Sequence, residues 1–125
     1  MRIFVITPRI AILALALCAS LSLGTAQAAK LTTPSFVVVV TENCKEDVAC
    51  EDVSYVGTNR KSGETIRLKG RTLVAMCGDG VTPCHHIGYE FRNGKIRYFV
   101  SEDGLLEVSK QHKVLVHESG TWESR

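Results

Sequence analysis

The chain has 125 residues, a length typical of one domain. Fifteen basic and thirteen acidic residues give a formal charge of +2, but the two arginines within residues 1–28 account for the whole excess. Residues 29–125 carry no net charge and no cluster of lysine and arginine along the sequence. We therefore expect no binding to nucleic acid, which requires a row of basic side chains.

The first 28 residues have the three parts of a secretory signal peptide. A positively charged start precedes an uncharged apolar run over residues 10–23, and Ala26-Gln27-Ala28 matches an A-x-A cleavage site. The apolar run is shorter than the roughly 20 residues that a membrane-spanning helix needs. The sequence therefore predicts a signal peptide at 1–28 and a single β domain at 29–125. We expect a periplasmic or secreted protein with no stable membrane anchor after cleavage.

The first three predicted strands follow from local patterns. A β-branched run at 36–40 and an alternating segment at 52–56 each predict one strand. Apolar residues share one phase from Ile66 to Met76, which predicts a long strand over 65–77 with a bend at Gly70.

Residues 87–118 contain the signals of a four-stranded antiparallel meander. Asn93-Gly94 lies between alternating runs and predicts a type I′ hairpin. The predicted pairs on one face are Phe91 with Ile96, Tyr89 with Tyr98, and Ile87 with Val100. On the other face we expect Glu90 opposite Arg97, and Phe99 over Gly88.

Two further three-residue loops complete the predicted meander. A loop over 102–104 pairs Val100 with Leu106 and Tyr98 with Val108, with glycine at the left-handed position. A loop over 110–112 pairs Val108 with Val114 and Leu106 with Val116. The sequence thus predicts an all-β fold of about seven strands, a small antiparallel sandwich or barrel, between which the pattern does not decide.

Four cysteines remain after the predicted cleavage, and an even number in a short exported chain predicts two disulfides. Three connectivities are possible. The local one, Cys44–Cys50 with Cys77–Cys84, is favoured because each pair brackets turn-forming residues.

The loop over residues 44–52 is the first candidate for a binding element. Closed by a disulfide, it would form a rigid acidic loop, and rigid loops lose little entropy on binding. The residues expected to contact a partner are Lys45, Glu46, Asp47, Glu51 and Asp52. A signal peptide, a small β domain and a disulfide-closed loop together resemble the layout of bacterial periplasmic lysozyme inhibitors. The loop lacks the proline and histidine that one such family inserts into lysozyme, so the resemblance covers layout and carries over no residue.

His85 and His86 form the second candidate binding element. Together with His112 and His117 they suggest an alternative function in metal binding. The spacing of Cys77 and Cys84 matches no zinc knuckle, and adjacent residues on a strand face opposite ways, so we expect no metal ligand. The Gly78-Asp79-Gly80 turn lacks a phosphate-binding pattern, and its glycines are expected to supply backbone angles.

No common catalytic motif is present, and the adjacent carboxylate pairs have no evident reason to shift their pKa. We expect no enzyme and no cofactor. The predicted function is that of an exported protein that binds and blocks another protein, of the inhibitor or immunity type. The alternatives are a periplasmic metal-binding protein and a small cell-envelope hydrolase.

Overall fold

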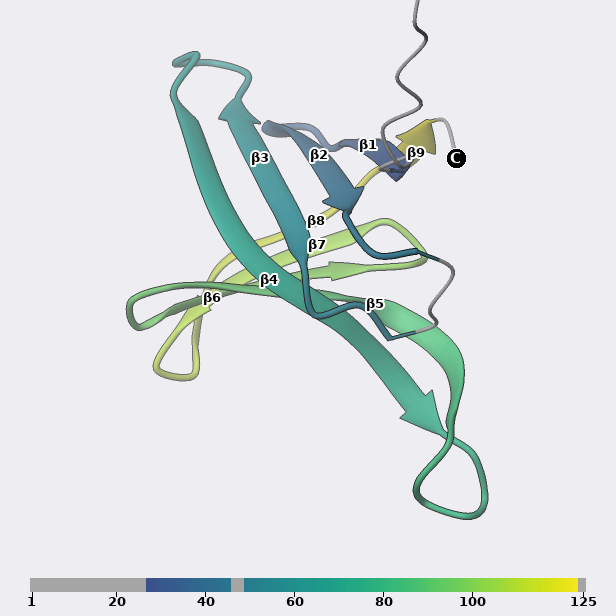
Figure 1. Cartoon of the computed structure of the whole chain (residues 1–125). Coiled ribbons are helices and arrows are strands. Elements are labelled where there is room, and N and C mark those ends of the chain that lie inside the picture. Colours follow the sequence, from purple (N-terminus) through teal and green to yellow (C-terminus); the bar gives the residue numbers. More distant parts are fainter. Residues whose placement is uncertain (1–26, 46–48, 124–125) are drawn as a thin grey trace, which may run out of the picture.

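The computed structural model describes residues 27–45 and 49–123 as an all-β protein (Figure 1). The described strands form one antiparallel sheet of nine, which confirms the predicted fold class and adds two strands, the first and the last, to the predicted seven. The strands are β1 (Gln27–Thr32), β2 (Phe36–Glu42), β3 (Val53–Asn59), β4 (Thr65–Met76), β5 (Pro83–Asn93), β6 (Ile96–Ser101), β7 (Leu105–Lys110), β8 (Lys113–Ser119) and β9 (Thr121–Glu123).

The predicted signal peptide lies outside the described residues except for Gln27 and Ala28, which begin β1. Both are exposed, whereas Ala29 and Leu31, which follow the predicted cleavage site, are buried in the core.

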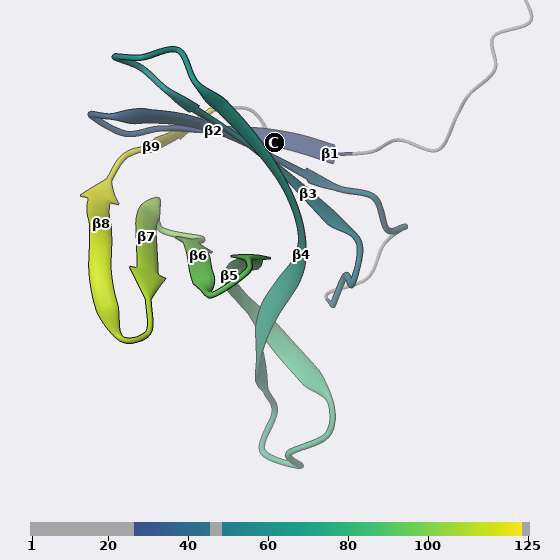
Figure 2. The same ribbon diagram turned by 90° about the vertical axis from the view of Figure 1, so that its left-hand side faces the viewer.

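The sheet curls into a nearly closed barrel because one bent segment joins its two edges (Figure 2). The strand order is β8-β7-β6-β5-β4-β3-β2-β1-β9, so that β8 pairs with β7 at one edge and β9 pairs with β1 at the other. A single residue, Gly120, separates β8 from β9. The structure thereby decides between the two predicted architectures in favour of the barrel.

Gly120 lies at the corner between β8 and β9, where its backbone is in close contact with the backbone of Thr32 on β1. A Cβ atom built there would collide with the carbonyl oxygen of Thr32 on β1 and with the side chain of Thr33. The Gly120 N–H donates to the carbonyl of Gly104 at 2.9 Å, which ties the corner to the turn between β6 and β7. Only a residue without a side chain allows this approach.

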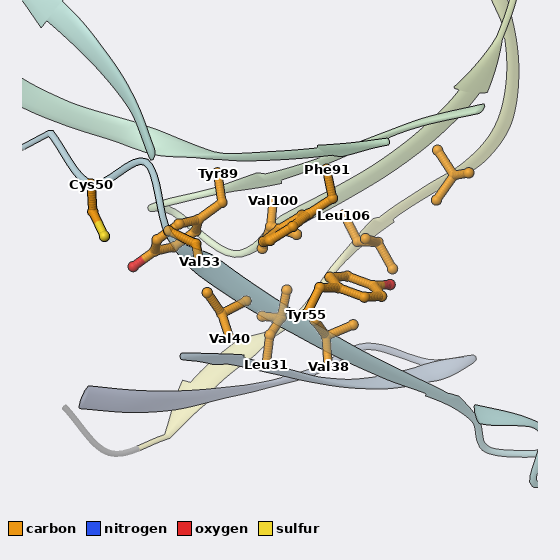
Figure 3. Packing of buried hydrophobic residues seen from close by; sticks show 11 residues of the cluster. Leu31, Val38, Val40, Cys50, Val53, Tyr55, Tyr89, Phe91, Val100 and Leu106 are labelled. Carbon is orange, nitrogen blue, oxygen red and sulfur yellow. The ribbon is translucent and has the colours of Figure 1, made fainter. Parts of the chain in front are cut away.

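Alternating side chains of the strands fill the interior (Figure 3). The ring of Tyr55 lies 5.0 Å from that of Phe91 and 5.4 Å from that of Tyr98. Burial, together with the nearby Tyr98, raises the pKa of Tyr55, so its hydroxyl stays protonated. Side chains that are at most 2% exposed make up most of the core: Leu31, Val38, Val40, Cys50, Val53, Tyr55, Tyr89, Phe91, Val100 and Leu106.

The long strand β4 confirms the strand predicted over 65–77 and belongs to both sides of the barrel. Its first half pairs with β3 and its second half with β5, and Gly70 is opposite both Val53 and Phe91. A Cβ at Gly70 would collide with the Glu90 carbonyl and the Phe91 ring. Figure 2 shows the strong curvature of β4.

The β5–β6 hairpin forms, but its turn differs from the prediction. Phe91 is opposite Tyr98 and Tyr89 is opposite Val100, so the predicted pairs are wrong by two residues. The turn residues are Gly94 and Lys95, and positive φ at Gly94 alone matches a type II′ turn rather than type I′. Because the shift is even, the side chains from Tyr89 to Val100 keep their predicted faces. Ile87, predicted on the core face, is 43% exposed because of a bulge between β4 and β5.

On the outward face of the same hairpin, the residue pairs also differ from the predicted ones. Glu90 is opposite Phe99, and Gly88 is opposite Ser101, so the predicted pairing of Glu90 with Arg97 and of Phe99 with Gly88 is wrong. The Glu90 carboxylate still reaches the Arg97 guanidinium diagonally, at 3.4 Å.

The predicted β6–β7 register is confirmed, with Val100 opposite Leu106, and Gly104 has φ of 98°. The predicted β7–β8 register is wrong, because Val108 is opposite Val116 and the turn has two residues. A register shift at Leu115 adds one residue to β8 and returns Val116 to the half-buried position beside the core.

Two side chains fasten the closing segment. Glu118 on β8 accepts hydrogen bonds from the Ser35 hydroxyl at 2.6 Å and the Ser35 N–H at 3.0 Å. Trp122 on β9 donates its indole N–H to the carbonyl of Ser101 at 3.3 Å. The hydrogen bonds from Ser35 lower the pKa of Glu118 below its ordinary value.

Gly120→Ala should destabilise the protein by about 1–3 kcal/mol, because the new methyl group forces the corner away from β1. Urea unfolding followed by tryptophan fluorescence measures the change. Gly78→Ala is the matched control, since a Cβ at Gly78 meets open space, and its stability should stay within about 0.5 kcal/mol of the wild type. Equal stability of the two variants would contradict the account of the corner.

Glu118→Gln should reduce stability by about 1 kcal/mol at pH 7, because the charge-assisted bonds to Ser35 are weakened. The folded-state pKa of Glu118 is lowered, so the unfolded chain binds the proton first and stability falls as pH drops below the ordinary value of 4.5. Urea unfolding at several pH values should show a smaller loss between pH 5 and pH 3 for the variant than for the wild type. Parallel losses would refute this role of Glu118.

Candidate functional site

The structure confirms both predicted disulfides, Cys44–Cys50 and Cys77–Cys84, with Cα atoms 5.7 and 5.0 Å apart. Two stable disulfides indicate an oxidising, non-cytoplasmic compartment. The two closed loops differ in their relation to the barrel.

The loop of the first disulfide is anchored in the core. Cys50 is 1% exposed, its N–H donates to the Thr72 hydroxyl at 2.7 Å, and its carbonyl accepts from the Thr72 N–H at 2.9 Å. These two hydrogen bonds attach the segment before β3 to β4.

The predicted contact residues of this loop are exposed where the structure describes them: Lys45, Glu51 and Asp52. Glu46 and Asp47 lie outside the described residues. The Asp52 carboxylate accepts hydrogen bonds from the Lys69 ammonium at 3.3 Å and from the Asn43 side-chain amide at 3.2 Å. Asp52 thus takes part in a surface network.

The loop of the second disulfide, residues 77–84, extends away from the barrel. It connects the far ends of β4 and β5, and both views show it projecting beyond the other strands (Figures 1 and 2). The sequence indicated that its glycines serve the backbone, and Gly80 does have φ of 70°.

Asp79 organises the interior of this loop. One carboxylate oxygen accepts from the N–H groups of Val81 and Thr82 at 2.9 Å each, and the other accepts from the Thr82 hydroxyl at 2.5 Å. These bonds, with that from the Thr82 hydroxyl strongest, lower the pKa of Asp79 to about 2. The Cys77 N–H also donates to the Thr82 carbonyl at 2.8 Å. The loop therefore has a fixed shape from its disulfide and its hydrogen bonds together.

The projecting hairpin presents apolar side chains to solvent. Val81 at the tip is 78% exposed, and Met76 at the end of β4 is 53% exposed. Ile87, 43% exposed, is the extra residue of a bulge where Leu73 and Val74 are opposite Gly88 and His86. Val81 and Met76 thus lie on the projecting part and Ile87 at its base, and exposed large apolar residues are typical of contact surfaces.

The predicted second element, His85 and His86, lies at the base of this hairpin on β5. His85 is exposed, whereas the His86 side chain is 16% exposed and packs edge-on against Tyr89 with ring centroids 4.7 Å apart. Its Nε2 lies 3.8 Å from the carboxylate of Glu42. The two histidines face opposite ways, so only His85 is available on the surface.

The other histidines are placed elsewhere. His112 is in the β7–β8 turn, and His117 lies 3.1 Å from the Glu107 carboxylate on the outer face. Among residues 27–45 and 49–123, no three histidine, cysteine or acidic side chains are grouped so that they could hold a metal ion.

Comparisons with protein-family models, with curated proteins and with solved structures find no match to this chain. In the part of the chain that the structure describes, no helix has the length and hydropathy needed to cross a membrane.

The projection of loop 77–84 and the exposure of Val81 were missed in the sequence. The available signal was a valine between Gly80 and Thr82 inside a cysteine-bounded turn, where a polar residue is more usual. Its exposure depends on the length of β4 beyond β3, which no local pattern reports.

A carboxyl titration of Asp79 by NMR should give a midpoint near pH 2, below the ordinary value of 3.8. Thr82→Val should raise the midpoint because it removes the strongest hydrogen bond, whereas Thr82→Ser should leave it low. A midpoint that is the same in both variants would show that the Thr82 hydroxyl does not hold the carboxylate.

Proposed function

We propose that this protein is exported to the periplasm or secreted, and that it blocks another protein by inserting loop 77–84 into a cleft of that partner. The observation that carries the proposal is the projection of a disulfide-closed, internally hydrogen-bonded loop with Val81 exposed at its tip.

Rigidity supports an inhibitory role for this loop. A loop that already has its bound shape loses little conformational entropy on binding, so more of the contact free energy contributes to affinity. Cys77, Cys84 and Asp79 together provide this preorganisation.

The chemistry of the tip indicates the kind of cleft. Gly80, Val81 and Thr82 are small, and the Asp79 carboxylate is engaged within the loop. We therefore expect a narrow cleft with an apolar pocket for Val81, flanked by surfaces that contact Met76 and Ile87. Loop 44–52, the first choice from the sequence, stays a prediction for a second contact.

Partner identification should start from a photo-crosslinking amino acid at position 81 in the oxidised protein, produced with its leader in the native host. The same crosslinker at position 115, where the leucine is 49% exposed on β8, is the matched control. The expected result is one protein captured from position 81 only, identified by mass spectrometry and then purified.

Val81→Asp should then weaken binding of the purified partner by about 30-fold or more, as expected for a central contact in an interface. Leu115→Asp should change the dissociation constant less than threefold. Calorimetry measures both constants, and an activity assay of the partner tests the block. Unchanged binding of Val81→Asp, with both variants folded by circular dichroism, would overturn the proposal.

A further inference from the structure

A groove on the outer face of the barrel, lined by residues between 92 and 114, has a different chemistry from loop 77–84. It has a volume of about 760 Å³ and lies between the β5–β6 and β7–β8 turns. Its charged lining residues are Arg92, Lys95, Arg97 and Glu107, and its other polar lining residues are Ser109, Gln111 and His112. We propose that this groove binds a small phosphorylated saccharide, with the phosphate held by the arginines.

The arginines are placed side by side by the register of the sheet. Arg92 on β5 is directly opposite Arg97 on β6, and Arg97 is directly opposite Ser109 on β7. Like charges that are directly opposite destabilise a sheet. The repulsion between Arg92 and Arg97 therefore lowers the stability of the folded protein, and a bound anion would reduce that repulsion.

One carboxylate partly compensates the pair from the side. The two oxygens of Glu90 lie 3.1 Å from Arg92 and 3.4 Å from Arg97, and the Arg97 guanidinium stacks 5.4 Å from the centre of the Phe99 ring. These contacts orient both guanidiniums, while one carboxylate for two guanidiniums leaves positive charge for a ligand. Planar guanidinium groups match phosphate oxygens in geometry and charge.

Lys95 adds a third cation to the lining, and Glu107 is its one carboxylate. The Glu107 carboxylate lies 3.1 Å from the imidazole of His117, a residue outside the groove lining, so it is already engaged on the side away from the arginines. The arginine side of the groove is therefore the side that attracts an anion.

The β7–β8 turn, at the other end of the groove, has a strained backbone at its two residues, Gln111 and His112. Gln111 and His112 have φ of 48° and 68°, in the left-handed region that side chains disfavour. A two-residue turn of this type is most stable with asparagine and glycine. Strained backbone positions such as these are often found where the side chain contacts a ligand. We therefore take the strain at Gln111 and His112 as support for a ligand in the groove.

The size and lining of the groove select the ligand class. The volume lies in the range of roughly 300–1,000 Å³ found for small-molecule sites. Ser109 and Gln111 offer hydrogen bonds to hydroxyl groups, and Val114 is the apolar side chain of the lining. Residues 29–125 have no net charge, which disfavours a long polyanion such as nucleic acid.

The test is an amide NMR titration of the purified, oxidised protein with glucose 6-phosphate, and with glucose alone as the unphosphorylated probe. Saturable shifts at Lys95, Ser109 and His112 with glucose 6-phosphate, and none with glucose, are expected. Arg92→Gln should weaken binding about tenfold, because it removes a charge-assisted contact. Arg67→Gln, an exposed arginine on β4 outside the groove lining, should change it less than twofold.

A second variant separates binding from folding. Replacing Gln111 and His112 together by asparagine and glycine should raise the melting temperature, because strain is removed, and should weaken glucose 6-phosphate binding at least threefold. Unchanged binding in this variant, or equal weakening by Arg92→Gln and Arg67→Gln, would overturn the proposal.

Three further probes test the ligand class at equal phosphate concentration: inorganic phosphate, phosphatidylglycerol vesicles and duplex DNA. Weaker binding of all three than of glucose 6-phosphate supports the saccharide. Tighter binding of vesicles or DNA would overturn it in favour of a lipid surface or a nucleic acid, and tighter binding of inorganic phosphate in favour of the free ion.

Discussion

The fold depends on the backbone approach at Gly120. Nine antiparallel strands leave two edges, and unpaired edges expose hydrogen-bonding groups that attract other chains. Here β8 continues through Gly120 into β9, which pairs with β1. The interior aromatic residues are enclosed only because this corner brings the backbones of Gly120 and Thr32 into contact. The Glu118–Ser35 and Trp122–Ser101 hydrogen bonds then hold the closing segment in place.

The nearly closed barrel is filled by its own side chains. Tyr55, Tyr89 and Phe91 occupy the interior. Both proposed contact surfaces therefore lie outside the core, one on a projecting loop and one on the outer face of the barrel. The β4–β5 hairpin projects because β4 continues past the end of β3, and the second disulfide fixes its tip. The outer groove exists because two turns lie on either side of a row of outward residues.

The two disulfides lie in different surroundings. Cys44–Cys50 ends in a buried residue, Cys50, whose backbone is hydrogen-bonded to Thr72, and it contributes to the core. Cys77–Cys84 lies beyond the body of the barrel, where its effect is on the shape of one exposed loop. The sequence predicted both disulfides and named the acidic first loop as the leading candidate for binding. In the structure Cys50 is buried and Val81 is exposed, and our proposal therefore assigns the contact to the second loop.

Local patterns in the sequence determined the all-β class, the long strand β4, the faces of the meander residues from Tyr89 to Val108, the β6–β7 register and the pairing of the cysteines. These depend on neighbours in the chain: alternation, glycine in a turn, and short loops between cysteines. Val114 was predicted on the core face and is exposed, because of the register shift between β7 and β8. The strand β1 was missed because it begins inside the predicted signal peptide, although its partner β2 follows directly in the chain. The strand β9 was missed because its partner β1 is distant in the sequence. The turns at Gly94 and Gln111 were misplaced because core packing of Tyr98 and Val116 selected the register over turn preference. Closure of the barrel, projection of Val81 and the row of Arg92 and Arg97 were decided only by the tertiary structure, since each requires strands to meet in space.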